Sequence, residues 1–251
     1  MMEPSYLETG DGRRIAYHFT EGAEPTLIFL GGFRSDMTGT KASVLEGWAK
    51  GAGHAFLRFD YTGHGASSGD FLDGSIGDWA RDAEDAITRL TSGPLVLVGS
   101  SMGGWISLLM ARRIPERTAG LIGIAAAPDF TEDSMFEGFT PAQRAELESA
   151  GFVDTPSDYS DEPYRITRRL IEDGRNNLVL RSPLDLPFPV RLLHGTADTD
   201  VPVSVALRTM EHATGPDIRL TLVKDADHRF SEPDNLALVA RTIEELVALR
   251  G

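Results

Sequence analysis

Short, mostly apolar runs alternate along the chain with segments of helical periodicity. The runs occupy residues 26–30, 55–59, 95–98, 120–125 and 190–193. Such runs are typical of strands that are covered on both faces of a sheet. The periodic segments between them, at residues 40–50, 76–90 and 102–113, predict crossover helices. The alternation therefore predicts an α/β fold with a mostly parallel sheet and helices on both faces.

The two ends of the chain complete this sheet. Residues 6–9 and 14–19 flank the turn sequence Gly10-Asp11-Gly12, which predicts an antiparallel hairpin at one edge. Towards the C-terminus, a helix at 203–212, a strand at 218–223 and an amphipathic helix at 234–250 continue the pattern. The prediction is an eight-stranded sheet, and 251 residues can bury one large core around it.

The alternation of strand and helix patterns is interrupted between residues 128 and 185. This segment shows no strong strand pattern, and its two helix-like pieces, 141–150 and 164–173, are separated by a polar stretch that carries prolines. So long an excursion inside a compact domain is usually a functional lid. We therefore expect a core domain made of residues 1–127 and 186–251, with residues 128–185 inserted as a helical cap.

The sequence Gly99-Ser100-Ser101-Met102-Gly103 follows one apolar run and opens a predicted helix. This context is the one that the nucleophile motif G-x-S-x-G requires, with the serine on a strained turn. The glycine spacing centres on Ser101 and leaves Ser100 as the rival nucleophile. A loop that holds a phosphate is the alternative for such a turn, but no lysine follows the glycines as in a Walker motif.

A nucleophilic serine needs a histidine base and an acid that orients the base. His228 lies beyond the last predicted strand, whereas the other histidines fall on strands, on a helix or in glycine turns. Asp198 follows the strand at 190–193 and gives the chain order Ser, Asp, His. Asp129, at an earlier strand end, is the rival acid, and Asp200 is expected to be solvated.

Two main-chain N–H groups are candidates for stabilising an oxyanion. One belongs to Met102, which follows the nucleophile at a helix N-terminus. The other belongs to Phe33, in the loop after the strand at 26–30, where Gly31 and Gly32 allow the backbone to come close to a substrate. A plain turn would explain this glycine pair almost as well.

Composition excludes several classes of protein. The net charge is −14 without a cluster of basic residues, which argues against nucleic acid as a partner. The chain has no cysteine, so thiolate catalysis and cysteine-bound zinc are excluded, and we expect no metal and no cofactor. No apolar run reaches membrane-spanning length. The acidic N-terminal region resembles neither a signal peptide nor a transit peptide, so we expect a cytoplasmic protein.

Taken together, residues 31–33, 60–65, 99–103, 194–198 and 227–228 resemble the α/β-hydrolase superfamily along nearly the whole chain. Residues 29–33, 39–42, 58–61, 99–105 and 191–195 look like a narrower branch, that of the abhydrolase-domain protein ten, whose members are described as acyl-protein (palmitoyl) thioesterases and acyl-glucuronide esterases. The resemblance implies the α/β-hydrolase fold. It also implies Ser101, Asp198 and His228 as the triad, with Phe33 and Met102 as oxyanion donors.

The chain departs from the pattern of its superfamily in two places. Gly31-Gly32 stands where many members carry His-Gly before the oxyanion residue. The chain also lacks a mitochondrial presequence, which favours a bacterial relative. The first departure bears on the geometry of the oxyanion loop and the second on the physiological substrate, because family membership carries the reaction and not the substrate.

These features predict a serine hydrolase that cleaves a carboxylic ester or thioester, either a small molecule or an acylated partner, as a monomer or homodimer. The residues expected to contact substrate are Gly32, Arg34, Phe136 and Phe139. Other aromatic and methionine residues of the cap are further candidates, namely Phe130, Met135, Phe152 and Tyr159. Two alternatives remain open. One is a binding or sensor protein without hydrolytic activity, and the other is a C–C bond hydrolase or lyase on the same fold.

Overall fold

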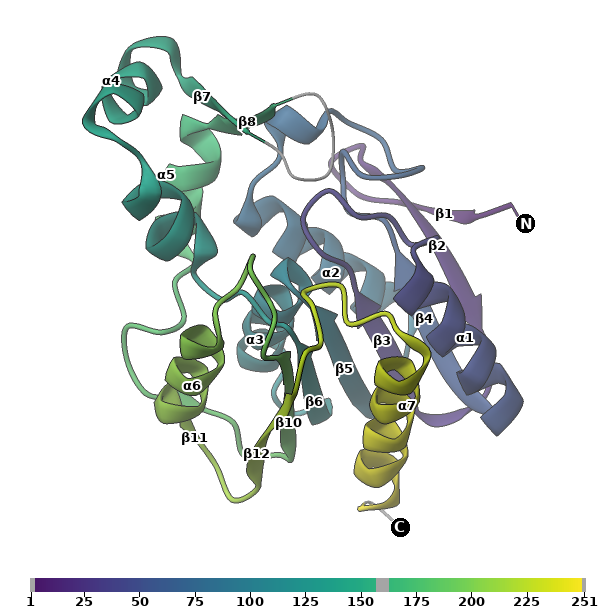
Figure 1. Ribbon diagram of the computed structural model, residues 1–251. Helices are drawn as coiled ribbons and strands as arrows, with labels where there is room; N and C mark the ends of the chain where they lie inside the picture. Colours follow the sequence, from purple (N-terminus) through teal and green to yellow (C-terminus); the bar gives the residue numbers. More distant parts are fainter. Residues whose placement is uncertain (1–2, 157–162, 250–251) are drawn as a thin grey trace.

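The protein is built around a central eight-stranded sheet (Figure 1), seen in a computed structural model that describes residues 3–156 and 163–249. The strand order is β1-β2-β4-β3-β5-β6-β10-β12. The strands are β1 (Ser5–Glu8), β2 (Arg14–Thr20), β3 (Ala23–Leu30), β4 (His54–Phe59), β5 (Leu95–Ser100), β6 (Thr118–Ile124), β10 (Val190–Gly195) and β12 (Ile218–Val223).

Strands β4, β3, β5, β6, β10 and β12 pair in parallel, whereas β1 with β2 and β2 with β4 pair antiparallel. The predicted fold class is therefore confirmed, including the antiparallel edge formed by the N-terminal strands. In a parallel sheet the carboxyl ends of all strands lie along one edge. The loops that follow β3, β5, β10 and β12 consequently meet at the same edge, although they are far apart in sequence.

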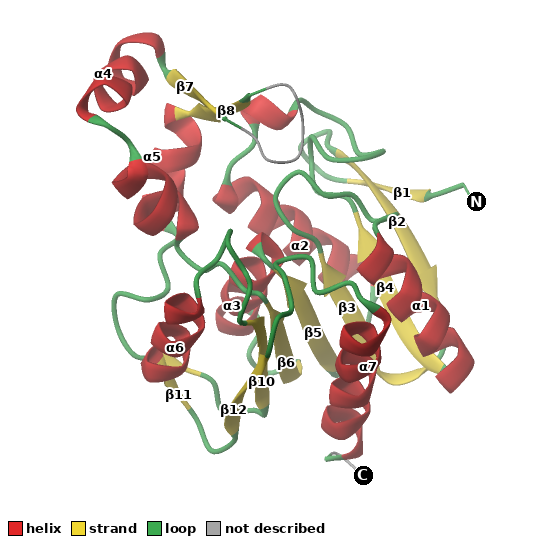
Figure 2. Ribbon diagram, viewed as in Figure 1, coloured by secondary structure: helices red, strands yellow, loops and turns green. Residues whose placement is uncertain are grey.

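Helices cover both faces of the sheet, as Figure 2 shows by the red elements on either side of the yellow strands. Helices α1 and α7 contact each other on one face, and α2 and α3 contact each other on the other. Helix α6 packs on β10 and β12. The bounds are α1 (Thr40–Ala52), α2 (Ile76–Leu90), α3 (Met102–Arg113), α6 (Val203–His212) and α7 (Pro233–Ala248), with a short 3-10 helix at Phe71–Asp73.

Strand β3 shows why the apolar runs are continuous. Leu27 and Phe29 belong to the core cluster of the α1 and α7 face. Ile28 and Leu30 point the other way and belong to the cluster that contains Trp79 of α2. Because both faces of this part of the strand are buried, residues 27–30 are all apolar.

The elements from a π-helix (Thr131–Phe136) to α5 (Arg168–Asn176), which follow β6, lie above the carboxyl edge of the sheet (Figure 1). The π-helix is followed by α4 (Pro141–Ala150), the antiparallel hairpin of β7 (Phe152–Thr155) and β8 (Tyr164–Thr167), and α5. A two-stranded parallel pair, β9 (Leu184–Asp185) with β11 (Ala213–Thr214), lies outside the main sheet. We call residues 128–185 the cap.

The prediction of a helix over 164–173 was wrong in its first four residues. Ile166 and Leu170 have helical spacing, but residues 164–167 form β8 and pair with β7. The helix begins only at Arg168, where the Thr167 side chain accepts a hydrogen bond from the Leu170 N–H at 3.2 Å and caps it. The expectation of no strong strand pattern in this segment also missed the short hairpin of β7 and β8.

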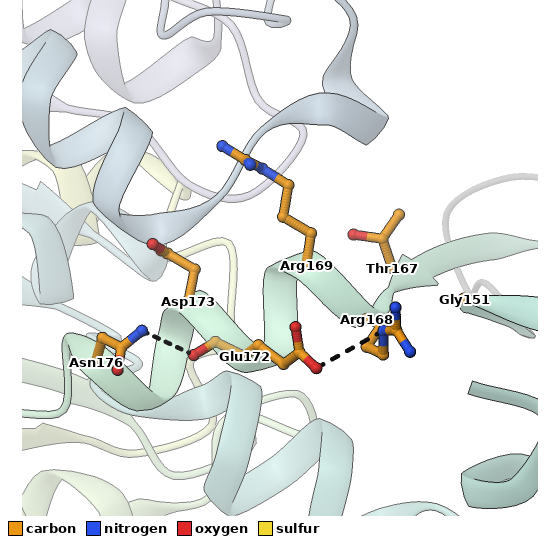
Figure 3. A pocket seen from close by; sticks show the side chains of 7 residues that line it. All are labelled: Gly151, Thr167, Arg168, Arg169, Glu172, Asp173 and Asn176. Atoms are coloured by element: carbon orange, nitrogen blue, oxygen red, sulfur yellow. Dashed lines mark hydrogen bonds and ion pairs between the residues drawn. The ribbon is translucent and has the colours of Figure 1, made fainter. Parts of the chain in front are cut away.

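A hollow of about 500 Å³ lies beside α5, and Figure 3 shows the side chains that line it. Its lining residues are Gly151, Thr167, Arg168, Arg169, Glu172, Asp173 and Asn176. Arg169 pairs with Asp78 of α2 at 2.7 Å, and the Asp173 carboxylate accepts from the Gly77 N–H at 2.6 Å. Arg169 and Asp173 therefore hold α5 against α2, whereas Arg168 and Glu172 pair with each other on α5.

Within the described ranges 3–156 and 163–249, no helix has the length and apolar character that crossing a membrane would require.

Candidate active site

Ser101 occupies a strained turn between β5 and α3. Its φ is 54° and its ψ −119°, a backbone conformation that non-glycine residues rarely adopt. Neighbouring main chain holds it there, since the Ser101 N–H donates to the Ile124 carbonyl at 2.9 Å and its carbonyl accepts from the Ala127 N–H at 3.0 Å. Backbone strain of this kind typically marks functional sites.

The two glycines of the motif are required by close packing around this turn. A Cβ on Gly99 would lie 2.2 Å from the Gly103 carbonyl oxygen, and a Cβ on Gly103 would lie 1.9 Å from the Leu30 carbonyl oxygen. Neither contact is possible for a real side chain. Glycine is thus required at both positions of the G-x-S-x-G motif for α3 to pack closely against β5 and β3.

Ser101, His228 and Asp198 meet at the carboxyl edge of the sheet. His228 Nε2 lies 3.1 Å from Ser101 Oγ, and His228 Nδ1 lies 2.9 Å from Asp198 Oδ2. Because the carboxylate can only accept, Nδ1 carries the proton and Nε2 is left to accept one from the serine. The three side chains predicted from the sequence are therefore brought together, in an arrangement suited to nucleophilic catalysis.

The environment of Asp198 keeps it ionised. Burial alone would raise the pKa of this carboxyl, but the hydrogen bonds from His228 and from the Val201 N–H outweigh burial and hold the pKa below its ordinary value. Nearby, His194 Nε2 lies 2.8 Å from the Val201 carbonyl and therefore donates to it. His194 is buried on β10 rather than placed in a glycine turn, and it fixes the loop that carries Asp198.

The rival acid and the rival nucleophile have other partners or positions. Asp129 is fully buried and accepts from the N–H groups of Val179 at 2.8 Å and Leu180 at 2.9 Å. It thereby anchors the segment that leaves the cap. Ser100 is the last residue of β5, and the serine hydroxyl that faces His228 belongs to Ser101.

Phe33 lines the same cavity as Ser101, and Met102 follows Ser101 as the first residue of α3. A Cβ on Gly32 would lie 3.4 Å from Ser101 Cβ, so the loop after β3 runs directly against the nucleophile. The Phe33 ring is held by edge contacts with Phe71 at 4.9 Å and Phe130 at 5.7 Å. In the described part of the chain, neither the Phe33 nor the Met102 N–H is a donor in the loop and turn hydrogen bonds, which suits both for an oxyanion.

The sequence at residues 60–65 supports this loop. The Asp60 carboxylate accepts from the Met37 N–H at 2.6 Å and from the Ala66 N–H at 2.8 Å, and so joins the loop after β3 to the loop after β4. The Tyr61 hydroxyl donates to the Gly31 carbonyl at 3.5 Å. This motif is therefore a support for the glycine pair rather than a group that faces the reacting atoms.

A cavity of about 560 Å³ opens above Ser101 and His228. Of the predicted contact residues, Gly32 and Arg34 line it, as do Phe130 and Met135 of the cap. The structure does not bring Phe136 and Phe139 to it, because they pack against each other 6.1 Å apart within the cap. Phe152 likewise packs under Arg165, and Tyr159 lies outside the described residues.

Sequence reasoning missed several residues of this cavity. Tyr164 reaches it from β8, Ser134 from the π-helix and Lys41 from α1. Lys41 belongs to the family-like sequence Gly39-Thr40-Lys41-Ala42, for which the sequence alone indicates no role. All four residues of that motif line the cavity.

The chain belongs to the alpha/beta hydrolase family, whose sequence profile matches residues 27–242, and it is a hydrolase. The mitochondrial palmitoyl-protein thioesterase ABHD10 of Rattus norvegicus is 37% identical over 244 residues, covering 97% of this chain and 82% of the relative. The human protein of the same name is 36% identical over 97% of this chain and 79% of its own length.

Two solved structures are similar over almost their whole length. A putative hydrolase from Agrobacterium vitis S4 superposes with a TM-score of 0.93 at 41% identity, covering 97% of this chain and 98% of the other. The alpha/beta hydrolase domain-containing protein 10 from mouse gives a TM-score of 0.93 at 35% identity, with full coverage of both chains. The resemblance to this branch is thereby confirmed. The cytoplasmic location remains a prediction, since the ABHD10 relatives are named as mitochondrial.

Proposed function

We propose that the chain is a serine hydrolase in which Ser101 attacks the carbonyl of an ester or thioester. The observation that carries this proposal is the hydrogen-bonded series from Ser101 Oγ through His228 to Asp198 beneath the cavity. His228 Nε2 accepts the serine proton as the Oγ–carbon bond forms, and Asp198 stabilises the imidazolium that results. The N–H groups of Phe33 and Met102 donate to the oxyanion.

Collapse of the tetrahedral intermediate breaks the bond to the leaving oxygen or sulfur. His228 gives its proton to that atom, and the acyl group remains on Ser101 as an ester. A water molecule then attacks the acyl-enzyme while His228 accepts one of its protons. The second collapse releases the carboxylic acid and returns the proton to Ser101 Oγ, so the side chains end as they began.

An acyl substrate suits both the cavity and the relatives. The ABHD10 proteins are named palmitoyl-protein thioesterases, and we infer the same broad chemistry, hydrolysis of an acyl thioester or ester, for this chain. Phe33, Phe130 and Met135 give one part of the cavity an apolar lining for the acyl chain. We further propose that residues 128–185 act as a cap domain on the core of residues 1–127 and 186–251.

Labelling by a fluorophosphonate probe tests the serine chemistry directly. The wild-type chain is expected to gain the mass of one probe, and Ser101→Ala is expected to gain none. Ser100→Ala is the matched control, since it removes a neighbouring hydroxyl and leaves the nucleophile in place. A wild-type chain that is folded yet unlabelled would contradict the proposal and favour a binding protein. Labelling that survives in Ser101→Ala would place the nucleophile elsewhere.

A further inference from the structure

Lys41 lines the cavity of the proposed active site from the first turn of α1. Its Nζ donates a hydrogen bond to the main-chain carbonyl of Arg229, the residue that follows His228. In the described part of the chain, Lys41 forms no ion pair with a carboxylate. Its ammonium group is therefore close to the base of the triad and lacks an ion-pair partner.

A lysine at this position is electrostatically unfavourable for the fold. The N-terminus of a helix carries partial positive charge, which disfavours a cation in the first turn, and α1 has no acidic residue there to compensate. Burial lowers the pKa of Lys41 to about 8; the charge of Asp227 opposes this shift, and that of Arg229 adds to it. A charge retained against such costs is a candidate for a functional group.

The charges around the cavity have the opposite sign to those of the whole chain. The net charge is −14, yet the cavity is lined by the cations Arg34, Lys41 and Arg229 and by one carboxylate, Asp200. Arg34 lies over the rings of Phe71 and Tyr164, 4.8 Å from each ring centre. Cationic lining of this kind concentrates anions in a cleft.

The reaction assigns Lys41 to one side of the substrate. His228 must give its proton to the leaving atom, so the leaving group lies over the imidazole. Lys41 contacts the residue next to that imidazole, whereas Phe130 and Met135 line the cavity from the cap. The ammonium group thus faces the leaving group rather than the acyl chain.

We propose that Lys41 binds a carboxylate or phosphate carried by the leaving group, and so makes the enzyme selective for acyl esters or thioesters of anionic alcohols and thiols. This inference rests on the proposed hydrolytic function and adds a substrate class to it. Lysine suits the role, because its ammonium group serves carboxylate and phosphate oxygens alike as a point charge.

Two pairs of substrates test the proposal, and within each pair the acyl group is the same. The first pair is para-nitrophenyl butanoate and the same ester with a carboxylate on the ring beside the nitro group. The second is butanoyl-coenzyme A, which carries phosphates, and the neutral butanoyl thioester of N-acetylcysteamine. The quantity measured is the ratio of kcat/KM for the anionic and neutral member of each pair. Loss of one charge-assisted contact in Lys41→Met is expected to lower this ratio about tenfold.

Matched variants separate binding by Lys41 from a change in net charge or structure. Lys41→Arg keeps the cation and is expected to keep most of the ratio. Lys50→Met removes the same charge from the exposed end of α1, and its ratio is expected to equal that of the wild type. If Lys41 prefers carboxylates, Lys41→Met lowers the kcat/KM ratio of the first pair only. If it prefers phosphates, Lys41→Met lowers the ratio of the second pair only.

The outcomes distinguish this inference from the function on which it rests. Equal ratios in wild type and Lys41→Met for both pairs, with neutral substrates still hydrolysed, would overturn the leaving-group assignment alone. Absence of turnover of every substrate by the wild type would overturn the hydrolase mechanism together with it.

Discussion

The loops of the proposed active site and the cap are attached to the sheet in different ways. Main-chain hydrogen bonds fix the loops: Ala197 donates to the Ala226 carbonyl at 3.0 Å, which joins the loop of Asp198 to the loop of His228. The cap is held by side-chain contacts: apolar residues such as Leu170 and Ile171 share a core cluster with Trp79, and ion pairs such as Arg208 with Asp133 at 2.6 Å add to them. The reaction geometry thus depends on main-chain contacts, whereas the proposed acyl pocket depends on side chains of the cap.

The sharpest test of this division compares two buried carboxylates, one in each region. Asp198→Asn is expected to lower kcat about 10⁴-fold, because an amide favours the wrong imidazole tautomer. Asp129→Asn is expected to change kcat less than about tenfold and to destabilise the fold by about 2 kcal/mol, since it weakens charge-assisted bonds to the cap segment. Steady-state kinetics and thermal unfolding of both variants measure these effects.

The opposite pattern would reverse the assignment. If Asp129→Asn abolished turnover in a folded chain while Asp198→Asn did not, the acid would come from the strand end before the cap. Thermal unfolding of Asp198→Asn serves as the control, because a variant that keeps its unfolding midpoint has lost chemistry and not structure.

Phe33, in the loop after β3, lies where the loops of the proposed active site meet the cap, since its ring contacts Phe130. Phe33→Pro deletes one N–H donor and the ring, whereas Phe33→Ala deletes the ring alone. One oxyanion donor is typically worth about 10²–10³ in kcat, so the proline variant is expected to be slower than the alanine variant by about that factor. Equal rates for the two folded variants would show that this N–H has no part in the reaction.

The sequence predicted the sheet well because burial on both faces leaves short, mostly apolar runs that recur between the helical segments. The buried parts of β3, β5 and β10 are mostly apolar, and each run is visible without any knowledge of its neighbours. The cap hairpin leaves no such pattern. Its strands have four residues each, and β8 runs directly into α5, so helical spacing extends backwards across the boundary.

The site was predictable to the extent that each residue follows a strand end. Ser101, Asp198 and His228 do so, but Asp129 also follows a strand between Ser101 and His228, so chain order alone does not separate the two acids. The pocket was not predictable, because residue type says nothing about direction. Phe136 was chosen as an aromatic side chain of the cap, yet the guanidinium groups of Arg144 and Arg175 lie 4.8 Å and 4.3 Å from its ring centre.

Acyl selectivity provides a test on the cap side of the comparison. Met135→Ala removes apolar lining worth about 0.8 kcal/mol for each CH₂ that the acyl chain buries against it. We expect about tenfold lower kcat/KM for octanoyl esters relative to acetyl esters. Phe139→Leu is the control, since this ring is buried within the cap and does not line the cavity. An unchanged chain-length profile in Met135→Ala would place the acyl group elsewhere.

The smallest expected effect is on the unfolding midpoint, and it tests whether the charge of Lys41 serves function or stabilises the fold. Folding lowers the pKa of Lys41 from 10.5 to about 8, so the folded chain holds this proton less tightly than the unfolded chain does. The charge therefore costs stability at pH 7, and the cost disappears as the pH rises from about 8 towards 10.5. Lys41→Met is expected to raise the unfolding midpoint at pH 7 by about 2–4 °C, or roughly 1 kcal/mol, and to lose most of this gain at high pH. A midpoint that falls at pH 7 would mean that Lys41 stabilises the fold, and its place beside His228 would then need no substrate to explain it.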